Sequence, residues 1–375
     1  MSKTKISILT FDLADNATGR ADLLARLLAP RYDVEVVGPQ FGAELWKPAQ
    51  AGPFAHRGVR GARYPRFAAR LPALLRLIDG GLIYASKPRP TSFGAALLKR
   101  LIARPPVLLD IDDWELGFFY RSGAWGQLGR FLNLSNPNGL PWTWLMEKLV
   151  PLASGLTVGS RFLEARFGGT LIPHVRDTDA WRPDRYDPRE ARARLAAGDR
   201  RIVMFLGTPR AYKGIEDLID AVGLLGRSDV LLALVGVGSR YATAPYVTTT
   251  EEIPFDDVPG YLAAADVVAV PQRVTSDTTG QVPAKIFDAM ALARPIVSTR
   301  VSMIPEILDG CGLLVPPRDP KALADAIARL LDDPSEAREL GARGRARCEA
   351  LYSFTATRAR LFPLVENVLS RTNRT

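Results

Sequence analysis

The sequence predicts an α/β protein with two doubly wound domains, and three observations support this class. Strand and helix patterns alternate along the chain, stop, and then alternate again. A polar, charged and proline-bearing segment without a strand pattern, residues 176–200, separates the two runs. The 375 residues are also more than one hydrophobic core usually holds. Short apolar runs that alternate with helical patterns are typical of parallel βαβ units, so we expect a parallel sheet in each half.

The first run of elements occupies the N-terminal half. Apolar runs predict strands at 6–9, 34–37, 82–84, 107–109, 156–158 and 171–172. Helical patterns follow at 20–28 and at 161–167, where Ser160 is the expected N-cap. This run predicts an N-terminal domain over residues 1–180.

The second run follows the polar segment and predicts a domain over residues 195–350. Strands are expected at 202–206, 230–235, 266–271, 295–299 and 312–315. Helices are expected at 214–225, 258–265, 284–292 and 320–331, with a last one at about 353–369. Ligands of such sheets bind at the carboxyl ends of the strands, so we look for function there.

Composition indicates a globular protein without a membrane span. Hydrophobic residues make up 47% and charged residues 24%, and no window reaches the run of about 18 apolar residues that a span needs. The N-terminus shows no signal-peptide pattern. Cys311 and Cys348 lack metal-ligand spacing and indicate a reducing compartment. We therefore expect a cytoplasmic protein.

The net charge of +9 is concentrated in one segment. Residues 57–104 contain eleven Lys or Arg and a single acid, Asp79. Such a segment can attract nucleic acid, an acidic membrane leaflet or an anionic substrate, or it can be a solvated basic face. Within it, residues 62–78 fit an amphipathic helix that can rest on the inner face of a membrane, although Pro72 argues against a long unbroken helix.

A strand that ends in a glycine and two cations marks the first candidate site. The stretch "FLGTPRAYKGIEDLIDAV", residues 205–222, places Gly207 after the strand, then Arg210 and Lys213, and then a helix. The first turn of a helix has N–H groups without intrahelical partners and a partial positive charge. We therefore expect Gly207, Arg210 and Lys213 to bind a phosphate or diphosphate. The alternative is a solvated turn with two ordinary cations; the P-loop spacing is absent.

A second glycine-bearing turn precedes a helix with charged residues. In "TTGQVPAKIFDAMALARPIV", residues 278–297, Gly280 allows close backbone approach, and the N–H groups of Gln281 and Val282 can join the anion site. Lys285 and Asp288 are three residues apart and face roughly the same way. A carboxylate such as Asp288 can accept hydrogen bonds from both hydroxyls of a ribose. The alternative is that Lys285 and Asp288 form a surface ion pair of little consequence.

The second half of the chain resembles the nucleotide-sugar domain of family 4 retaining glycosyltransferases, which have the GT-B fold. The resemblance rests on the segments "FLGTPRAYKGIEDLIDA", "LLALVGVG", "VPGYLAAADVVAVPQ" and "QVPAKIFDAMALARPIVSTRVSMIPEILDGCGLLVPPRDPKALADAI". It implies two Rossmann-like domains facing across a cleft, with an acceptor side at 1–180 and a donor side at 195–350. It also implies that a helix at 355–375 crosses back onto the first domain.

The same resemblance implies an activity. The expected reaction moves a hexose-type sugar from a nucleotide diphosphate sugar to an acceptor hydroxyl, with retention of anomeric configuration, no metal and no cofactor. The acceptor would be a saccharide, a lipid-linked molecule or a small molecule, as in polysaccharide or glycolipid biosynthesis. A nucleotide-sugar epimerase of the same fold and a basic nucleic-acid-binding protein are the alternatives, although no nucleic-acid module pattern appears.

Family roles transfer to some positions on the donor side. Lys213 matches the lysine that holds the donor diphosphate. The family arginine falls on Thr208, so Arg210 would have to reach in from the same loop. Asp288 fits the second of two paired acids, the ribose ligand. The first acid falls on Gly280, and Asp277 is the nearest acid that can replace it.

On the acceptor side, Asp112 and Asp113 stand where the family often has a histidine. They can orient a hydroxyl or act as a general base if burial raises their pKa, and the alternative is helix capping and solvation. Asp110 and Asp112 also fit a DxD metal motif, but we expect no metal, because GT-B enzymes stabilise the leaving diphosphate with cations and helix dipoles. Gly19 lies where the family has a loop that contacts the donor phosphate. We assign catalytic roles to Asp112, Asp113, Arg210 and Lys213.

Overall fold

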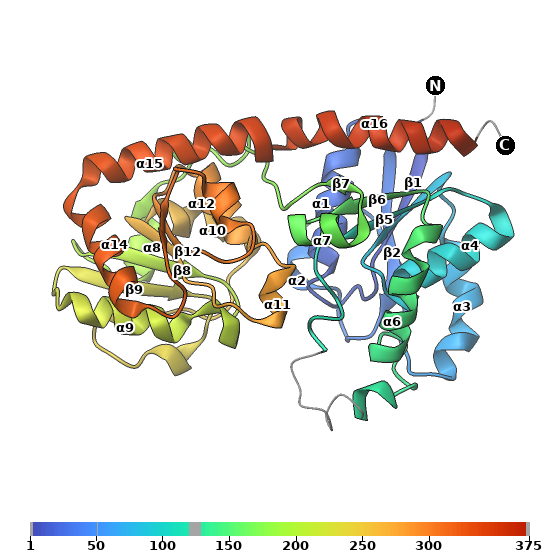
Figure 1. Cartoon of the computed structure of the whole chain (residues 1–375), viewed down its shortest axis with the longest axis horizontal. Helices are drawn as coiled ribbons and strands as arrows, with labels where there is room; N and C mark the ends of the chain where they lie inside the picture. Colours follow the sequence, from blue (N-terminus) through green and yellow to red (C-terminus); the bar gives the residue numbers. More distant parts are fainter. Residues whose placement is uncertain (1–2, 51, 120–128, 373–375) are drawn as a thin grey trace. The chain divides into compact units, whose positions relative to one another are not determined.

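A computed structural model describes residues 3–50, 52–119 and 129–372 of the chain (Figure 1). The chain divides into two compact units. The first contains residues 1–173 and 357–375, and the second contains residues 174–356. Each unit has a parallel sheet with helices on its faces, which confirms the prediction of two doubly wound α/β domains.

The first unit is built on a seven-stranded parallel sheet of order β3-β2-β1-β4-β5-β6-β7. The strand order reverses between β1 and β4, and such a switch point is where doubly wound sheets bind ligands. The strands are β1 (Lys5–Leu9), β2 (Asp33–Gln40), β3 (His56–Arg60), β4 (Leu82–Ser86), β5 (Val107–Ile111), β6 (Gly155–Val158) and β7 (Thr170–Leu171).

The helices of the first unit follow the strands. They are α1 (Thr18–Leu28), α2 (Lys47–Gln50), α3 (Arg66–Leu77), α4 (Ala95–Ala103), α6 (Leu140–Leu149) and α7 (Arg161–Phe167), with short helical turns η1 (Pro90–Gly94) and η2 (Val150–Leu152). Ser160 accepts from the N–H of Leu163 and so caps α7 as expected. The last helix, α16 (Phe354–Thr372), packs on α1 from residue 357 on, where Arg358 donates to the carbonyl oxygens of Arg26 and Leu27.

The second unit has a six-stranded parallel sheet of order β10-β9-β8-β11-β12-β13. Its strands are β8 (Arg201–Leu206), β9 (Val230–Val235), β10 (Val247–Thr249), β11 (Val267–Val270), β12 (Ile296–Thr299) and β13 (Leu313–Val315). Its helices are α8 (Pro188–Arg194), α9 (Ile215–Leu225), α10 (Val258–Ala263), α11 (Ser276–Thr279), α12 (Ala284–Ala291), α13 (Ile304–Leu308), α14 (Pro320–Asp332) and α15 (Pro334–Arg347), with short turns η3 (Pro183–Arg185), η4 (Ala211–Lys213), η5 (Ser239–Tyr241), η6 (Phe255–Asp257) and η7 (Cys348–Tyr352).

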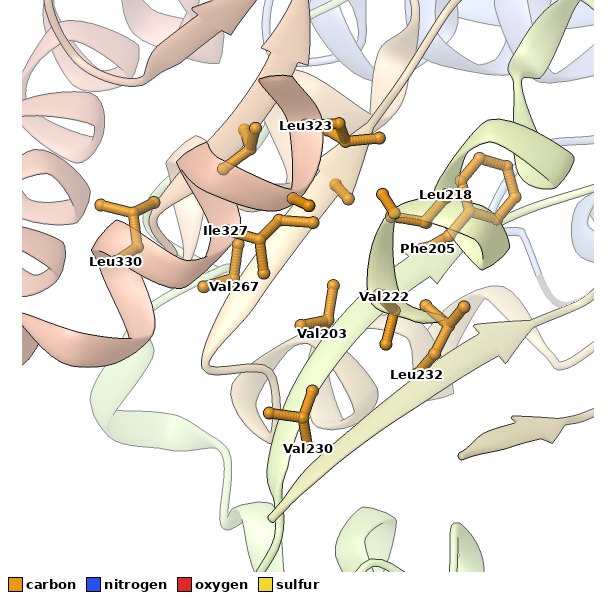
Figure 2. Packing of buried hydrophobic residues seen from close by; sticks show 14 of the residues in the cluster. Val203, Phe205, Leu218, Val222, Val230, Leu232, Val267, Leu323, Ile327 and Leu330 are labelled. Atoms are coloured by element: carbon orange, nitrogen blue, oxygen red, sulfur yellow. The ribbon is translucent and has the colours of Figure 1, made fainter. Parts of the chain in front are cut away.

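Figure 2 shows the hydrophobic core on one face of the second sheet. Side chains of β8, β9 and β11 meet those of α9 and α14, including Val203, Leu232, Leu218 and Ile327. The strands are buried on both faces and read as continuous apolar runs, which is why the sequence located most of them.

The sequence missed the edge strands β3 and β10, which are five and three residues long and hold one large apolar residue each, Val59 and Val247. Of the described helices of five or more residues, it missed α4, α6, α8, α13 and α15. α8 lies inside the segment predicted as a domain boundary. That segment belongs to the second unit, because Arg176 pairs with Ser353 in a parallel bridge and the chain divides at Pro173 and His174.

The predicted amphipathic helix in the basic segment is present but is not available as a membrane face. α3 continues through Pro72 for a full twelve residues, so the expected break does not occur. Phe67 and Leu74 of its apolar side are buried in the core of the first unit, and Leu71, Leu75 and Leu77 pack against that core. A helix whose apolar side already packs on its own domain cannot insert that side into a leaflet.

Truncating a residue of the second core tests its contribution. We expect Ile327→Ala, at a position with no exposure, to destabilise the second unit by about 2–5 kcal/mol, because the removed atoms leave a cavity. Leu224→Ala on α9, where the side chain is 61% exposed, should change stability by less than about 0.5 kcal/mol. Denaturant unfolding monitored for both variants makes the comparison, and equal losses would contradict this account of the core.

Candidate functional site

Two lysines lie together over Gly207 at the carboxyl end of β8. A methyl group added to Gly207 would lie 2.3 Å from Cε and 2.4 Å from Nζ of Lys285, so only glycine leaves room for that side chain. The φ of +125° at Gly207 also favours glycine. Lys213 donates to the carbonyl oxygen of Thr208 in the same loop. Side chains from β8–α9 and from α12 therefore converge on one loop.

The two amines perturb each other. Burial, followed by the charges of Lys285 and Arg210, lowers the pKa of Lys213 to about 6. Burial also lowers the pKa of Lys285, although Asp288 and a hydrogen bond to Lys213 oppose the shift. At neutral pH the amine of Lys213 is therefore largely in its neutral form. A site that holds one amine neutral is prepared for an anion that restores its charge.

The remaining residues of the first predicted site lie around this pair. Arg210 precedes the turn η4 and acts on Lys213 electrostatically, while its own side chain is exposed. Gly214 is the N-cap of α9 with a φ of +65°, and a Cβ there would lie 2.0 Å from the carbonyl oxygen of Pro271. The predicted turn of Gly207, Arg210 and Lys213 thus comes together at the N-terminus of α9.

Asp288 is held by a residue that the sequence did not single out. Its side chain is 7% exposed, and its Oδ1 accepts from Nε of Arg176. The guanidinium lies over Trp181, 5.5 Å from the ring centroid. The backbone of Arg176 is fixed as well, because its N–H donates to Tyr352 and its carbonyl accepts from Phe354. The alternative of a Lys285–Asp288 surface ion pair is therefore wrong.

The turn before α12 differs in part from expectation. The N–H of Gln281 donates to Thr278 at 3.3 Å, so the structure does not support its predicted place among the anion donors. Val282 is buried at 3% exposure, and Gly280 follows α11 as its C-cap. The side chain of Asp277, the expected replacement for the acid at Gly280, lies outside the described residues.

On the first unit, Asp112 and Asp113 belong to a buried ion-pair cluster after β5. Nζ of Lys87 lies 2.9 Å from Asp112, 2.7 Å from Asp113 and 2.9 Å from Glu115. Lys87 has a φ of +69°, a strained conformation of the kind found at functional sites. The guanidinium of Arg89 pairs with Glu115. The alternative of capped and solvated acids is therefore wrong.

The carboxylates of this cluster have different acidities. Burial raises the pKa of Asp113 to about 6, assisted by Asp112 and Glu115 and opposed by Lys87. Burial opposes ionisation of Glu115, but the Arg89 and Lys87 cations outweigh it and keep the pKa of Glu115 below its usual range. Asp113 is also more exposed than Asp112, at 16% against 5%. Asp113 is therefore the carboxylate best suited to exchange a proton near neutral pH.

Asp110 has a structural partner. Arg20 donates to both of its carboxylate oxygens at 2.8 Å and to the carbonyl oxygen of Ile172 at 2.7 Å, while Thr157 donates to Asp110 at 2.7 Å. Each acid of the DxD motif is thus paired with a cation. Among the described residues, no group of three or more His, Cys, Asp or Glu is arranged to hold a metal ion.

Gly19 lies against the ring of Trp46, where a larger residue would not fit. A Cβ there would lie 2.9 Å from the ring of Trp46, and the N–H groups of Gly19 and Arg20 donate to Asn16 and Ala17. Because both donors are used within the turn, the structure does not support the predicted phosphate contact at Gly19.

The comparison with protein families identifies the domain that carries the lysine pair. The family model described as glycosyl transferases group 1 matches residues 200–333. Residues 200–333 therefore resemble the glycosyl transferases group 1 family. This domain includes Lys213, Lys285 and Asp288, and it ends within α14.

Two relatives of the chain are named as transferases. The chain is 33% identical over 218 residues to the GDP-mannose-dependent α-(1-6)-phosphatidylinositol monomannoside mannosyltransferase of Mycolicibacterium smegmatis, which covers 52% of this chain and 57% of the relative. It is 32% identical over 183 residues to the α-D-kanosaminyltransferase of Streptomyces kanamyceticus, and this match covers 44% of this chain and 46% of the relative. The chain thus spans about half the length of these relatives.

Solved structures show the fold over the whole chain. Sucrose-phosphate synthase from Thermosynechococcus elongatus superposes with a TM-score of 0.71 at 20% identity, covering 98% of this chain and 100% of that one. HepE of Anabaena, in complex with UDP and glucose, gives a TM-score of 0.73 at 18% identity, covering 97% and 99%. The GT-B fold predicted from the sequence is confirmed.

The residues that sequence analysis missed are cationic partners of the predicted acids. Arg20, Lys87, Arg89 and Arg176 each lie far in sequence from the carboxylate they bind. The available signal was weak: Lys87 and Arg89 follow the strand predicted at 82–84, whose carboxyl end lies next to the switch point between β1 and β4.

A nucleotide analogue can test the role of Arg176. If Asp288 contacts the ribose as the sequence predicts, we expect Arg176→Met to weaken nucleoside diphosphate binding about tenfold or more, because the buried Asp288 loses the cation that fixes its carboxylate. The preference for the ribonucleotide over its 2′,3′-dideoxy analogue should shrink as well. Calorimetric titration with both ligands measures this, and Arg176→Lys should recover part of the preference.

Arg182→Met is the matched control, because Arg182 pairs with Asp184 at the surface of the same segment. The role of Arg176 would be refuted if the Arg176→Met protein kept the full wild-type preference for the ribonucleotide over its 2′,3′-dideoxy analogue, whatever its stability.

The pH dependence of nucleotide binding tests the lysine pair. A diphosphate restores the charge of Lys213, so binding takes up about one proton at pH values above the free pKa of about 6. The affinity should therefore fall as pH rises from 7 towards the ordinary lysine pKa of about 10.4. Calorimetry in two buffers of different ionisation enthalpy counts the proton, and Lys213→Met should abolish its uptake. An affinity that is constant from about pH 7 to 9 would contradict the assignment.

Proposed function

We propose that this protein transfers a sugar from a nucleoside diphosphate sugar to an acceptor hydroxyl, with retention of anomeric configuration and without a metal ion. The observation that carries the proposal is the Lys213–Lys285 pair over Gly207, inside a domain of the glycosyl transferases group 1 family. As the bond between the sugar and the phosphate breaks, negative charge develops on the diphosphate. Preorganised cations beside that oxygen stabilise the transition state more than the ground state.

The donor is held at two ends in this proposal. Lys213, Lys285 and Arg210 neutralise the diphosphate, and Arg210 supplies its charge from the exposed side of the loop. Asp288, fixed by Arg176, accepts from the ribose hydroxyls. The names of two relatives and neighbours give GDP-mannose and UDP with glucose as donors to test.

The acceptor side belongs to the first unit in this proposal. The acceptor hydroxyl loses its proton as the new glycosidic bond forms, and Asp113, with a pKa raised to about 6, is the group placed to orient it and to accept that proton. Lys87 fixes the position of the carboxylate. A relative named for phosphatidylinositol mannoside makes a lipid-linked saccharide a reasonable class of acceptor to test.

We also propose that the protein works in the cytoplasm, at the inner face of the membrane. Among the described residues, no helix is long and apolar enough to cross a bilayer. Both cysteines are free and buried, in keeping with a reducing compartment.

Release of nucleoside diphosphate from a panel of sugar donors tests the activity, and the anomeric configuration of the product, read by NMR coupling constants, tests retention. We expect release with a subset of donors and in the presence of chelator. The proposal would be refuted if the protein released nucleoside diphosphate from none of the donors and also bound no nucleoside diphosphate.

Asp113→Asn separates the acceptor step from donor binding. We expect kcat to fall by about 10²–10⁴, with little change in nucleotide affinity, because the variant cannot accept a proton. In the wild type kcat/KM for the acceptor should rise through about pH 6 as Asp113 ionises, and the variant should lose this limb. Glu164→Gln, a surface acid paired with Arg161, is the control. An unchanged pH profile in Asp113→Asn would assign the proton transfer elsewhere.

A further inference from the structure

Exposed apolar side chains gather on one part of the first unit. Among the described residues, fourteen large apolar side chains are exposed, and nine of them lie within residues 98–152. Leu101 and Ile102 on α4 are the most exposed, at 80% and 71%. Single exposed apolar residues are ordinary, but such a concentration marks an interaction surface.

Four of these nine side chains line a groove along α3, α4 and α6, helices that lie near one another in Figure 1. The groove encloses about 1230 Å³. Its walls are mostly apolar and include Leu98 and Leu101 of α4, Trp142 and Leu145 of α6, and Leu152 of η2. Trp144 lines a second hollow on α6 that shares Pro151 and Ala153 with the first. The apolar surface therefore continues across α6.

The rim of the groove is cationic. Arg100, Arg104 and Arg371 line it, and no Asp or Glu is among its lining residues. Lys148 lies over the ring of exposed Trp144, 5.7 Å from its centroid. The acid of α6, Glu147, is buried and bound to Arg166. We define these features, the groove with Ile102, Trp144 and Lys148, as the α4–α6 surface.

We propose that the α4–α6 surface docks on an anionic phospholipid bilayer, with the apolar side chains in the acyl region and the cations at the headgroups. Apolar and aromatic residues ringed by Lys and Arg are the pattern of interfacial membrane contacts. Each cation near an anionic leaflet adds attraction, and the groove gives room for a lipid chain. The proposal rests on the proposed location at the inner face of the membrane and names the surface that makes the contact, but it does not depend on the transfer reaction.

Charge decides between this occupant and a second copy of the chain. A twofold dimer through the α4–α6 surface would bring its cations against a surface whose groove has three arginines and no acid among its lining residues. Like charges that face each other across an interface are unfavourable. An anionic bilayer complements the rim, whereas a second copy does not.

Sedimentation of the full chain with vesicles tests the proposal. We expect the wild-type protein to pellet with phosphatidylglycerol-containing vesicles at low salt, and much less with pure phosphatidylcholine or at high salt. Leu101→Glu/Ile102→Glu should weaken binding by more than about tenfold, because the two exposed positions would carry charge into the apolar layer. Arg104→Gln should weaken it about fivefold.

Matched controls exist in the second unit. Leu224→Glu adds a charge at a position that is 61% exposed. Arg318→Gln removes an exposed arginine whose φ of +60° resembles the +58° of Arg104. Both control variants should bind vesicles as the wild type does. Quenching of tryptophan fluorescence by brominated lipid, reduced in Trp144→Phe, should show insertion directly.

Absence of vesicle binding by the wild type, or unchanged binding by Leu101→Glu/Ile102→Glu, would overturn the proposal. A concentration-dependent dimer in sedimentation velocity that Leu101→Glu/Ile102→Glu dissociates would assign the surface to a second copy and would also overturn it. Nucleoside diphosphate affinity, measured in parallel, reports on the donor site of the second unit. It should be unchanged in every α4–α6 variant, so failure of membrane docking is distinct from failure of the proposed sugar transfer.

Discussion

Two lysine amines held together over one glycine are the constraint on which the donor side of this protein depends. Lys285 occupies the space where any other residue at position 207 would carry a Cβ, and Lys213 turns back onto the same loop. Bringing two ammonium groups together without water is unfavourable, and the lowered pKa of Lys213 is the measure of that cost. This pair of amines therefore favours binding of an anion. In the proposed reaction that anion is the diphosphate, and it is bound more tightly as it gains negative charge during cleavage of its bond to the sugar.

The two sheet edges have opposite electrostatic character. The edge of the second unit gathers cations with one fixed acid, Asp288, whereas the edge of the first unit gathers three carboxylates around Lys87 with Arg89 beside them. Each edge therefore suits a different partner in a transfer reaction. Cations suit the departing phosphate, and a carboxylate with a raised pKa suits a hydroxyl that must lose its proton.

Most of the fold was predictable from the sequence, because strands buried on both faces appear as apolar runs and glycines mark the turns that follow them. The same local signals located Gly207, Lys213, Lys285 and Asp288. They did not locate the ion-pair partners, since Arg176 lies 112 residues from Asp288 and Arg20 lies 90 residues from Asp110. A partner that far away is fixed only by the folded chain. The hydrogen bonds that backbone amides make within their own turns, such as those of Gly19 and Gln281, are equally invisible in a sequence.

Arg176 is a long-range partner that fixes the carboxylate of Asp288, a residue that the sequence analysis identified. Asp288 is a short acid, and its oxygen Oδ1 is already committed to a guanidinium. The carboxylate can still accept through its other oxygen, and its position is now set by Arg176. The backbone of Arg176 is itself bonded to Tyr352 and Phe354, which immediately precede the point where the chain leaves the second unit. The position of Asp288, and with it the proposed ribose contact, is therefore tied to the segment from which α16 begins.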